Sequence, residues 1–269
     1  MVRALLGIVL LVSICGCGSG YVMTVPDVVS PPGSQLPAVV MLEWSELMGF
    51  SKPVKGAACR FSVDDGPLRG AYTDNLGYAA VALNAPASQG VYTLNVQHMD
   101  ADGDEVSAES GLFVWNPESM VVAVDLDSIS PHNASARDAL TELAQQANII
   151  YFTRDPQWHT GGARKRIEDE NLPAGPVLMW KRRLWRLGSH DRLNTPKLII
   201  DEGMVSPLAI LREMFANFAS GVTNSQSSVN AYMQAGIKPI VIDAQRVKGD
   251  VIHCAGWDEL NAGCLVDTK

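Results

Sequence analysis

Two carboxylates, Asp125 and Asp127, directly follow an uncharged run of the sequence, Met120–Val124. The β-branched residues of this run are typical of a strand buried on both faces, as in a parallel α/β sheet. Carboxylates at the end of such a strand lie at the carboxyl edge of the sheet, where open α/β sheets bind ligands. Because two unpaired carboxylates this close would repel each other, the pair favours a bound divalent cation or a role in handling phosphate. The alternative is a strand that ends in an Asx turn and caps the following helix.

A second strand is expected to bring polar side chains to the same edge. Residues Ala134 to Ala147 predict an amphipathic helix, because the apolar side chains recur at helical spacing. The next run, Asn148–Arg154, predicts a second buried strand that ends in the hydroxyl of Thr153 and the guanidinium of Arg154. A strand, a helix and a strand predict a right-handed parallel βαβ unit. The hydroxyl and the guanidinium are therefore expected beside the two carboxylates.

The same alternation of apolar runs and helical patterns continues, so residues 118–246 predict an α/β domain with a parallel, Rossmann-like sheet. A charged helix is expected over 163–171, and a loop leading into a strand over 173–179. Lys197 opens a further apolar run, Leu198–Ile200. After it we expect a helix over 209–218, a strand that ends at Asn224, a helix over 227–235 and a strand over 237–242.

The region before this domain has a different pattern. Residues 38–117 contain short apolar runs separated by turn signals, and they predict a small β-sandwich of roughly seven strands. Thr73–Ala79 and Gly90–Thr93 resemble segments of bacterial immunoglobulin-like modules. Residues 18–37 are rich in Pro, Gly, Ser and Val, and they predict an extended tether.

The N-terminus has the pattern of an export signal. Arg3 supplies a positive charge, and Ala4–Ile14 is an apolar stretch too short to span a bilayer comfortably. Residues 1–17 resemble a bacterial lipoprotein signal, in which Cys17 would become the acylated N-terminal residue. A simple secretory signal and an uncleaved anchor are the alternatives. The resemblance implies a lipid-anchored protein on the periplasmic face of the bacterial cell envelope, and Gly18 after the cysteine favours the outer membrane.

Three further cysteines would then lie in an oxidising compartment, Cys59, Cys254 and Cys264. A disulfide between Cys254 and Cys264 would close the C-terminal tail, residues 247–269, into a small loop. Three buried thiols are the alternative.

The composition, with 47% hydrophobic and 19% charged residues, is that of a globular protein. With 21 Lys and Arg against 29 Asp and Glu, the formal net charge is −8. A nucleic-acid-binding surface is therefore not expected.

Residues 120 to 245 together resemble the haloacid-dehalogenase superfamily of phosphotransferases, and within it the lipin-type phosphatidate phosphatases. The segments that carry the resemblance are VVAVDLDSIS, IIYFTRD, LPAGPVLMW, TPKLIIDE and TNSQSSVNAYMQAGIKPIVID, in this order. The resemblance implies a Mg²⁺-dependent phosphatase that acts on a phosphorylated small molecule or a phospholipid.

The family's catalytic roles correspond to four positions. Asp125 would attack phosphorus and carry the aspartyl-phosphate, and Asp127 would protonate the leaving oxygen and then activate water. Thr153 would hold phosphate oxygens, and Lys197 would offset the charge of the transferring phosphoryl group. The resemblance also assigns Mg²⁺ to Asp125 and Asp127, and it adds Arg154 and Asn224 to the phosphate-binding residues.

The sequence also departs from the family pattern. Ile129 replaces a threonine, and Ser225 replaces an arginine beside Asn224. The acidic residue that completes the magnesium site corresponds to Ser228, which follows another serine, Ser227. Loss of this carboxylate removes a charge that balances the metal.

Two functions therefore stay open at the level of sequence. One is a membrane-anchored phosphatase, and the other is a catalytically degenerate lipoprotein of the same fold that serves as a binding or scaffold module. Serines alone near Asp125 would favour the second.

Overall fold

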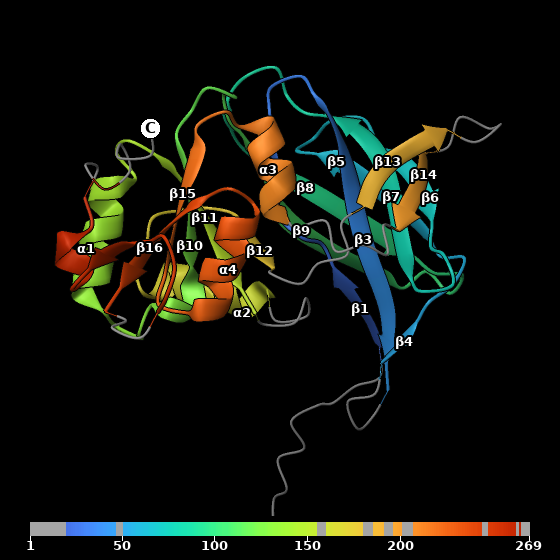
Figure 1. Ribbon diagram of the computed structural model, residues 1–269. Coiled ribbons are helices and arrows are strands. Elements are labelled where there is room, and N and C mark those ends of the chain that lie inside the picture. The colour runs from blue at the N-terminus through green and yellow to red at the C-terminus, as the bar shows by residue number, and fades with distance from the viewer. Residues whose placement is uncertain are drawn as a thin grey trace, which may run out of the picture.

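The computed structural model describes residues 20–46, 51–154, 160–179, 185–190, 196–200, 207–243, 247–261 and 264. The predicted signal peptide and Cys17 lie outside these residues. The chain forms a β-sandwich and an α/β domain, which pack side by side (Figure 1).

The sandwich consists of two sheets that enclose one apolar core. The first sheet contains β1 (Gly20–Thr24), β3 (Gln35–Ser45), β4 (Ser51–Pro53) and β7 (Tyr78–Asn84). The second contains β2 (Val28–Ser30), β9 (Glu105–Val114), β8 (Gly90–Met99), β5 (Ala58–Val63) and β6 (Arg69–Tyr72), in this order. Alternate residues of both sheets, such as Val40, Phe61 and Leu112, face the common core.

The predicted tether over 18–37 is wrong for the residues that the structure describes. β1 pairs antiparallel with β3, from Gly20 opposite Ser45 to Thr24 opposite Met41. β2 pairs in parallel with β9. Two of the prolines and the glycine that suggested an extended tether lie in the turn before β3, where Gly33 adopts a positive φ of 66°. The described part of the sandwich therefore begins at β1 and contains nine strands, β1 to β9.

The α/β domain is built on a parallel sheet of six strands, in the order β12-β11-β10-β15-β16-β17. Its central strands are β10 (Val121–Asp125), β11 (Asn148–Thr153) and β15 (Phe218–Thr223). The outer strands are β12 (Val177–Met179), β16 (Lys238–Ile242) and β17 (Ile252–Cys254). The chain therefore leaves β10 in one direction along the sheet and returns on its other side, as in doubly wound sheets.

Helices cover both faces of this sheet. On one face lie α1 (Ala134–Leu143) and α2 (Thr160–Asp169), together with the short η3 (Trp257–Glu259). On the other lie α3 (Pro207–Met214) and α4 (Gln226–Gln234). Side chains of β10 alternate between the two cores: Val122 and Val124 face α1, and Val121 and Ala123 face α3 and α4.

β17 corrects the prediction of a C-terminal tail over 247–269. It extends the sheet beside β16, from Ile252 opposite Ile240 to Cys254 opposite Ile242. Cys254 and Cys264 are free thiols, so the predicted disulfide is not formed. The Cys264 Sγ instead contacts two oxygens, Glu259 O at 3.6 Å and Asn261 Oδ1 at 3.8 Å. Burial and the neighbouring Cys264 raise the pKa of Cys254 to about 12, so its thiol stays protonated at neutral pH.

A separate hairpin interrupts the α/β pattern. β13 (Trp185–His190) and β14 (Pro196–Ile200) pair with each other in an antiparallel ladder and not with the parallel sheet. The hairpin lies against β3 and β7 of the sandwich (Figure 1). The expectation that the run after Lys197 belongs to the α/β sheet is therefore wrong.

Asp27, in the loop between β1 and β2, connects the two domains. Its buried carboxylate accepts hydrogen bonds from Gly111 N in the sandwich (2.8 Å) and from Val177 N in the α/β domain (2.8 Å). Arg164 of α2 pairs with the same carboxylate at 2.7 Å. One side chain thus links β9, β12 and α2.

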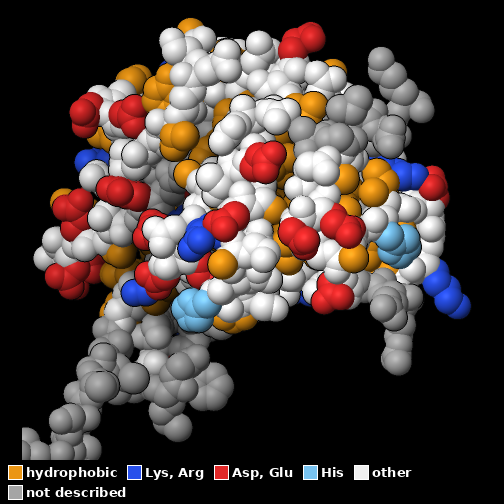
Figure 2. Space-filling view, turned by 90° about the vertical axis from the view of Figure 1, so that its left-hand side faces the viewer, with side chains coloured by type: hydrophobic (Ala, Val, Ile, Leu, Met, Phe, Trp, Pro, Cys, Tyr) orange, Lys and Arg blue, Asp and Glu red, His pale blue; other side chains and the backbone are white. Residues whose placement is uncertain are grey.

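The face of the α/β domain that carries α1 has acidic side chains spread over it and no large basic patch among its coloured atoms (Figure 2). Among the described residues, no helix is long and apolar enough to cross a membrane.

Candidate functional site

The carboxyl edge of the parallel sheet brings together most of the predicted site residues. Asp125 is the last residue of β10, and its side chain is fully buried. The neighbouring strands on either side end at Thr153 and Thr223. Because Asp125 follows Val121 and Ala123 in the strand alternation, its side chain points towards the face covered by α3 and α4. Ser228 of α4 meets it there.

Four hydrogen bonds surround the Asp125 carboxylate. Oδ2 accepts one from Ser228 Oγ at 2.7 Å and one from Thr223 Oγ1 at 2.8 Å. The guanidinium of Arg154 reaches both oxygens, with Nη2 at 3.1 Å from Oδ2 and Nη1 at 3.4 Å from Oδ1. Oδ2 therefore accepts three hydrogen bonds, whereas Oδ1 accepts only the long one from Arg154 Nη1.

Asp127 is held by the end of β11. Its Oδ1 accepts a hydrogen bond from Thr153 Oγ1 at 3.1 Å, and its Oδ2 accepts one from the backbone N–H of Arg154 at 2.9 Å. Arg154 Nη1 adds an ion pair at 3.1 Å. The Arg154 guanidinium therefore bridges the two carboxylates. Asp125 makes no side-chain cap hydrogen bond to the turn that follows β10, as the alternative of an Asx turn would have required.

A cluster of serine hydroxyls completes the shell around the guanidinium. Arg154 Nη2 donates to Ser225 Oγ at 3.1 Å and to Ser227 Oγ at 3.4 Å, and it also contacts Ser228 Oγ. Ser225 and Ser227 lie 2.8 Å apart through their hydroxyls. All three serines lie at the start of α4, so the N-terminus of this helix faces the guanidinium group of Arg154.

Asn224 lies at the rim of the site. Its backbone N–H donates to Ser128 Oγ at 2.9 Å, and its Oδ1 accepts from the same hydroxyl at 2.9 Å. Ser128 belongs to the short 3₁₀ turn η1 (Leu126–Ser128) that follows β10. The pair ties the loop after β10 to the loop after β15.

Burial and the charge of Asp125 raise the pKa of a tyrosine beneath the site. Tyr232 of α4 is fully buried, and burial raises its pKa well above the ordinary value of 10.0. The negative charge of Asp125 adds to this rise in pKa, and the positive charge of Arg154 opposes it.

As arranged, the side chains do not fit a magnesium ion. Mg²⁺ needs near-octahedral oxygen ligands at about 2.0–2.1 Å, whereas a guanidinium already pairs with both Asp125 and Asp127. The third position holds the neutral hydroxyl of Ser228, which donates to Asp125. In the described part of the chain, no group of three His, Cys, Asp or Glu side chains could hold a metal ion.

The site thus contains Asp125, Asp127, Thr153, Arg154 and Asn224, as the sequence predicts. Lys197 is not brought to this edge by the sheet, because its strand β14 belongs to the hairpin on the sandwich; its side chain lies outside what the structure describes. Sequence reasoning missed Thr223 and Ser128. Thr223 was accessible to the rule that found Thr153, since both are polar residues that end strands next to β10.

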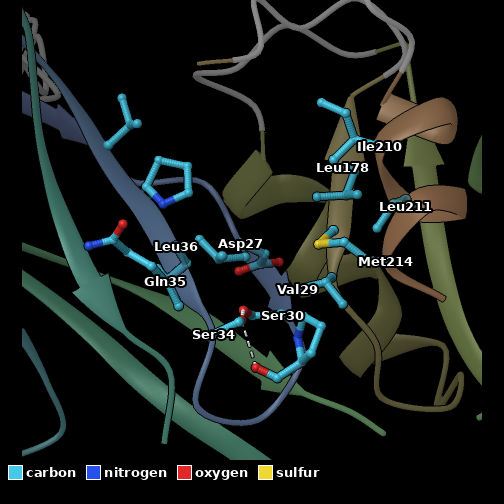
Figure 3. Close-up of a pocket in the computed structure, with 14 residues that line it drawn as sticks. Asp27, Val29, Ser30, Ser34, Gln35, Leu36, Leu178, Ile210, Leu211 and Met214 are labelled. Atoms are coloured by element: carbon cyan, nitrogen blue, oxygen red, sulfur yellow. Dashed lines mark hydrogen bonds between the residues drawn. The ribbon is translucent and has the colours of Figure 1, made fainter. Parts of the chain in front are cut away.

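A cavity also lies between the two domains. It has a volume of about 310 Å³ and is enclosed by β2 and β3 on one side and by β12 and α3 on the other. Figure 3 shows Leu178, Leu211 and Met214 facing Leu36 across it. The hydroxyl of Ser34, which also lines the cavity, already donates to Pro31 O at 2.8 Å. The cavity is therefore mostly apolar and separate from the Asp125 site.

No family model and no curated protein matches the sequence. Among solved structures, a carbohydrate acetylesterase from Xanthomonas citri is 14% identical and covers 89% of this chain and 73% of its own, with a TM-score of 0.29. CopC from Methylosinus trichosporium OB3b is 21% identical over 38% of this chain and 99% of its own, with a TM-score of 0.24. A purple acid phosphatase from yellow lupin is 10% identical over 64% of this chain and 37% of its own, with a TM-score of 0.32. These scores are too low to assign a fold or a function.

Proposed function

We propose that the chain is a lipid-anchored envelope protein whose α/β domain is a catalytically degenerate haloacid-dehalogenase-like module that binds a ligand and does not hydrolyse it. The observation that carries this proposal is the state of Asp125. The carboxylate is fully buried and receives four hydrogen bonds, one pair of them from a guanidinium. A nucleophile must direct a lone pair at phosphorus, and here Oδ2 already accepts three hydrogen bonds while the guanidinium of Arg154 lies against Oδ1.

The order of the strands supports the fold part of the proposal. The first strand of the domain, β10, is central and ends at Asp125, with Asp127 in the turn that follows, and beside it the order in which the chain adds strands to the sheet reverses. Ligands of such sheets bind outside the carboxyl ends of the strands at this reversal. The exposed groups there are polar, with Asn224 and Ser227 at the rim.

The charges at the edge favour a ligand without a phosphate group. Asp125 and Asp127 together carry two negative charges, and Arg154 offsets one of them. A phosphate anion would meet a remaining negative charge, whereas hydroxyl groups would find donors and acceptors in the serines and in Asn224. We therefore propose a neutral, hydroxyl-rich ligand in place of the phosphorylated one that the sequence suggests.

An active phosphatase is the second candidate, and one observation favours it. The Arg154 side chain is 42% exposed, so it has room to turn away from the carboxylates. Thr153 and Asp127 would then face the edge together with Asp125.

Phosphate release decides between the two. Wild type, Asp125→Asn and the surface control Asp138→Asn would be assayed with Mg²⁺ on phosphatidate and p-nitrophenyl phosphate. We expect no release by wild type above that of Asp125→Asn. Release by wild type and by Asp138→Asn that disappears in a folded Asp125→Asn would overturn the proposal and establish the phosphatase.

A further inference from the structure

We infer that Arg154 is a permanent internal cation that takes the place of a divalent metal ion at the Asp125–Asp127 edge. The inference rests on the proposed function in one respect only, which is that this edge is the functional site. It concerns the identity of the positive charge there, and it is testable without any assay of activity.

The position of the guanidinium carries the first step. It lies between a fully buried carboxylate and one that is 29% exposed, and it contacts both. A buried carboxylate must be paired with a positive charge, because desolvation of an unpaired charge is costly. The planar fork of arginine satisfies two acceptors at once and keeps its charge at every physiological pH.

The second observation is that neutral serine hydroxyls surround the Arg154 guanidinium. A divalent cation prefers carboxylate and carbonyl oxygens, whereas the hydroxyls of Ser225, Ser227 and Ser228 accept hydrogen bonds from Arg154 Nη2. Serines can also donate, and Ser228 does so to Asp125. The hydroxyl of Ser228 therefore links the guanidinium to the carboxylate. A metal ion would need both a third carboxylate at this position and the space that the guanidinium occupies.

The backbone carries the third step. Arg154 follows the last residue of β11, and its own N–H donates to Asp127 Oδ2 at 2.9 Å. The guanidinium is thus covalently attached to the strand next to β10. Unlike a bound metal ion, it cannot dissociate or be removed by a chelator. Ligand binding at this edge should be independent of divalent cations and unaffected by EDTA.

The test exchanges the internal cation for a metal ion. Arg154→Ala/Ser228→Asp removes the guanidinium and supplies a third carboxylate beside Asp125 and Asp127. Binding of Mn²⁺ would be followed by electron paramagnetic resonance, and the melting temperature would be measured with and without Mg²⁺. Ser228→Asp alone is the matched control, because it adds the carboxylate but keeps the guanidinium.

We expect wild type and Ser228→Asp to bind no stoichiometric Mn²⁺. The double variant should bind one Mn²⁺ ion, with a dissociation constant at least about tenfold lower than that of any weak binding by Ser228→Asp. Addition of Asp125→Asn to the double variant should abolish this binding. Arg154→Gln/Ser228→Asp, whose amide retains some hydrogen bonding, is a second variant for the case in which the first does not fold.

Three results would overturn the inference. One is stoichiometric Mn²⁺ binding by wild type that is lost in Asp125→Asn. Another is a folded double variant that binds no metal. The third is failure of both double variants to fold even when Mn²⁺ is present, since a metal ion at this position should replace the missing charge. None of these results depends on phosphatase activity, so the inference and the proposed function fail separately.

Discussion

At the scale of single residues, the contact between Asp125 and Arg154 should contribute more to the free energy of unfolding than any other contact of the site. The carboxylate has no access to water, and the guanidinium is its charged partner. Thr223 and Ser228 are neutral donors that improve the environment of the charge but do not cancel it. Removal of the guanidinium should therefore cost far more than removal of either hydroxyl.

A double-mutant cycle tests this difference. Arg154→Ala should lower the free energy of unfolding by about 2–3 kcal/mol, somewhat less than for a fully buried pair because the arginine is partly exposed. In the Asp125→Asn background the same substitution should cost at most about 1 kcal/mol, because no buried charge is then left unpaired. Urea denaturation of the four proteins measures the coupling. Additivity within about 0.5 kcal/mol would contradict the pairing.

The residue types at the site were predictable, but their pairing was not. Polar residues at the ends of adjacent parallel strands indicate a common edge, and Asp125, Asp127, Thr153 and Arg154 were found in this way. The sequence does not show that Arg154 turns back onto the carboxylates. Its direction depends on the serines of α4, which lie more than 70 positions further along the chain.

At the scale of elements, the packing of α4 against β15 sets the position of Ser228. Gly221 in β15 lies beneath the ring of Tyr232, one helical turn after Ser228. A Cβ atom at Gly221 would lie 2.6 Å from two atoms of that ring. The absence of a side chain at this position allows the helix to approach the sheet closely.

Gly221→Ala should therefore destabilise the domain by about 1–3 kcal/mol through overpacking. The matched control is Gly162→Ala in α2, where a Cβ would meet no atom within 4 Å. That substitution should stabilise the protein by about 0.4–1 kcal/mol, because it restricts the unfolded chain. Thermal or urea melts of both variants suffice, and a neutral Gly221→Ala would show that α4 is free to move.

Element types were predictable where the period of apolar residues was clear. β10, β11 and α1 lie close to the predicted ranges, because continuous β-branched runs and helical spacing are strong signals. The hairpin of β13 and β14 was not recognised, because Leu198–Ile200 resembles a buried strand of either domain. Which sheet it joins is decided by tertiary contacts with β3 and β7.

At the scale of the whole molecule, Asp27 links the two domains through hydrogen bonds, beside an apolar cluster in which Val29 and Phe113 of the sandwich pack with side chains of the α/β domain. Its carboxylate is buried and is shared by β9, β12 and α2. Two backbone N–H groups and one guanidinium would lose their acceptor together if it were removed. Such a loss acts on the contact between domains rather than on either core.

Asp27→Ala should lower the free energy of unfolding by about 3 kcal/mol, because it leaves two backbone donors without their acceptor and removes the charged partner of Arg164, which keeps only its bonds to Val25 O and Glu109 O. We expect calorimetry to show one unfolding transition for wild type and two for Asp27→Ala. Asp250→Ala, which removes an exposed pair with Lys238, should change stability by no more than about 1 kcal/mol. A single cooperative transition in Asp27→Ala would mean that other contacts join the domains.

The two-domain architecture was predictable from the change in pattern near residue 117, but its N-terminal boundary was not. Pro, Gly and Ser dominate residues 18–37, and they concealed two short strands whose partners, β3 and β9, are distant in sequence or follow a turn. Short strands paired with remote partners leave little trace in local composition.

The pairing of β1 with β3 limits where this protein can work. Cys17, the predicted site of lipid attachment, precedes the first residue of β1 by three positions. Even fully extended, three residues span only about 10 Å. If the cysteine carries the lipid, the sandwich lies close to the headgroups of the bilayer, and the protein diffuses in the plane of the membrane. It would then meet its ligands by a two-dimensional search, among molecules that are themselves held at that membrane.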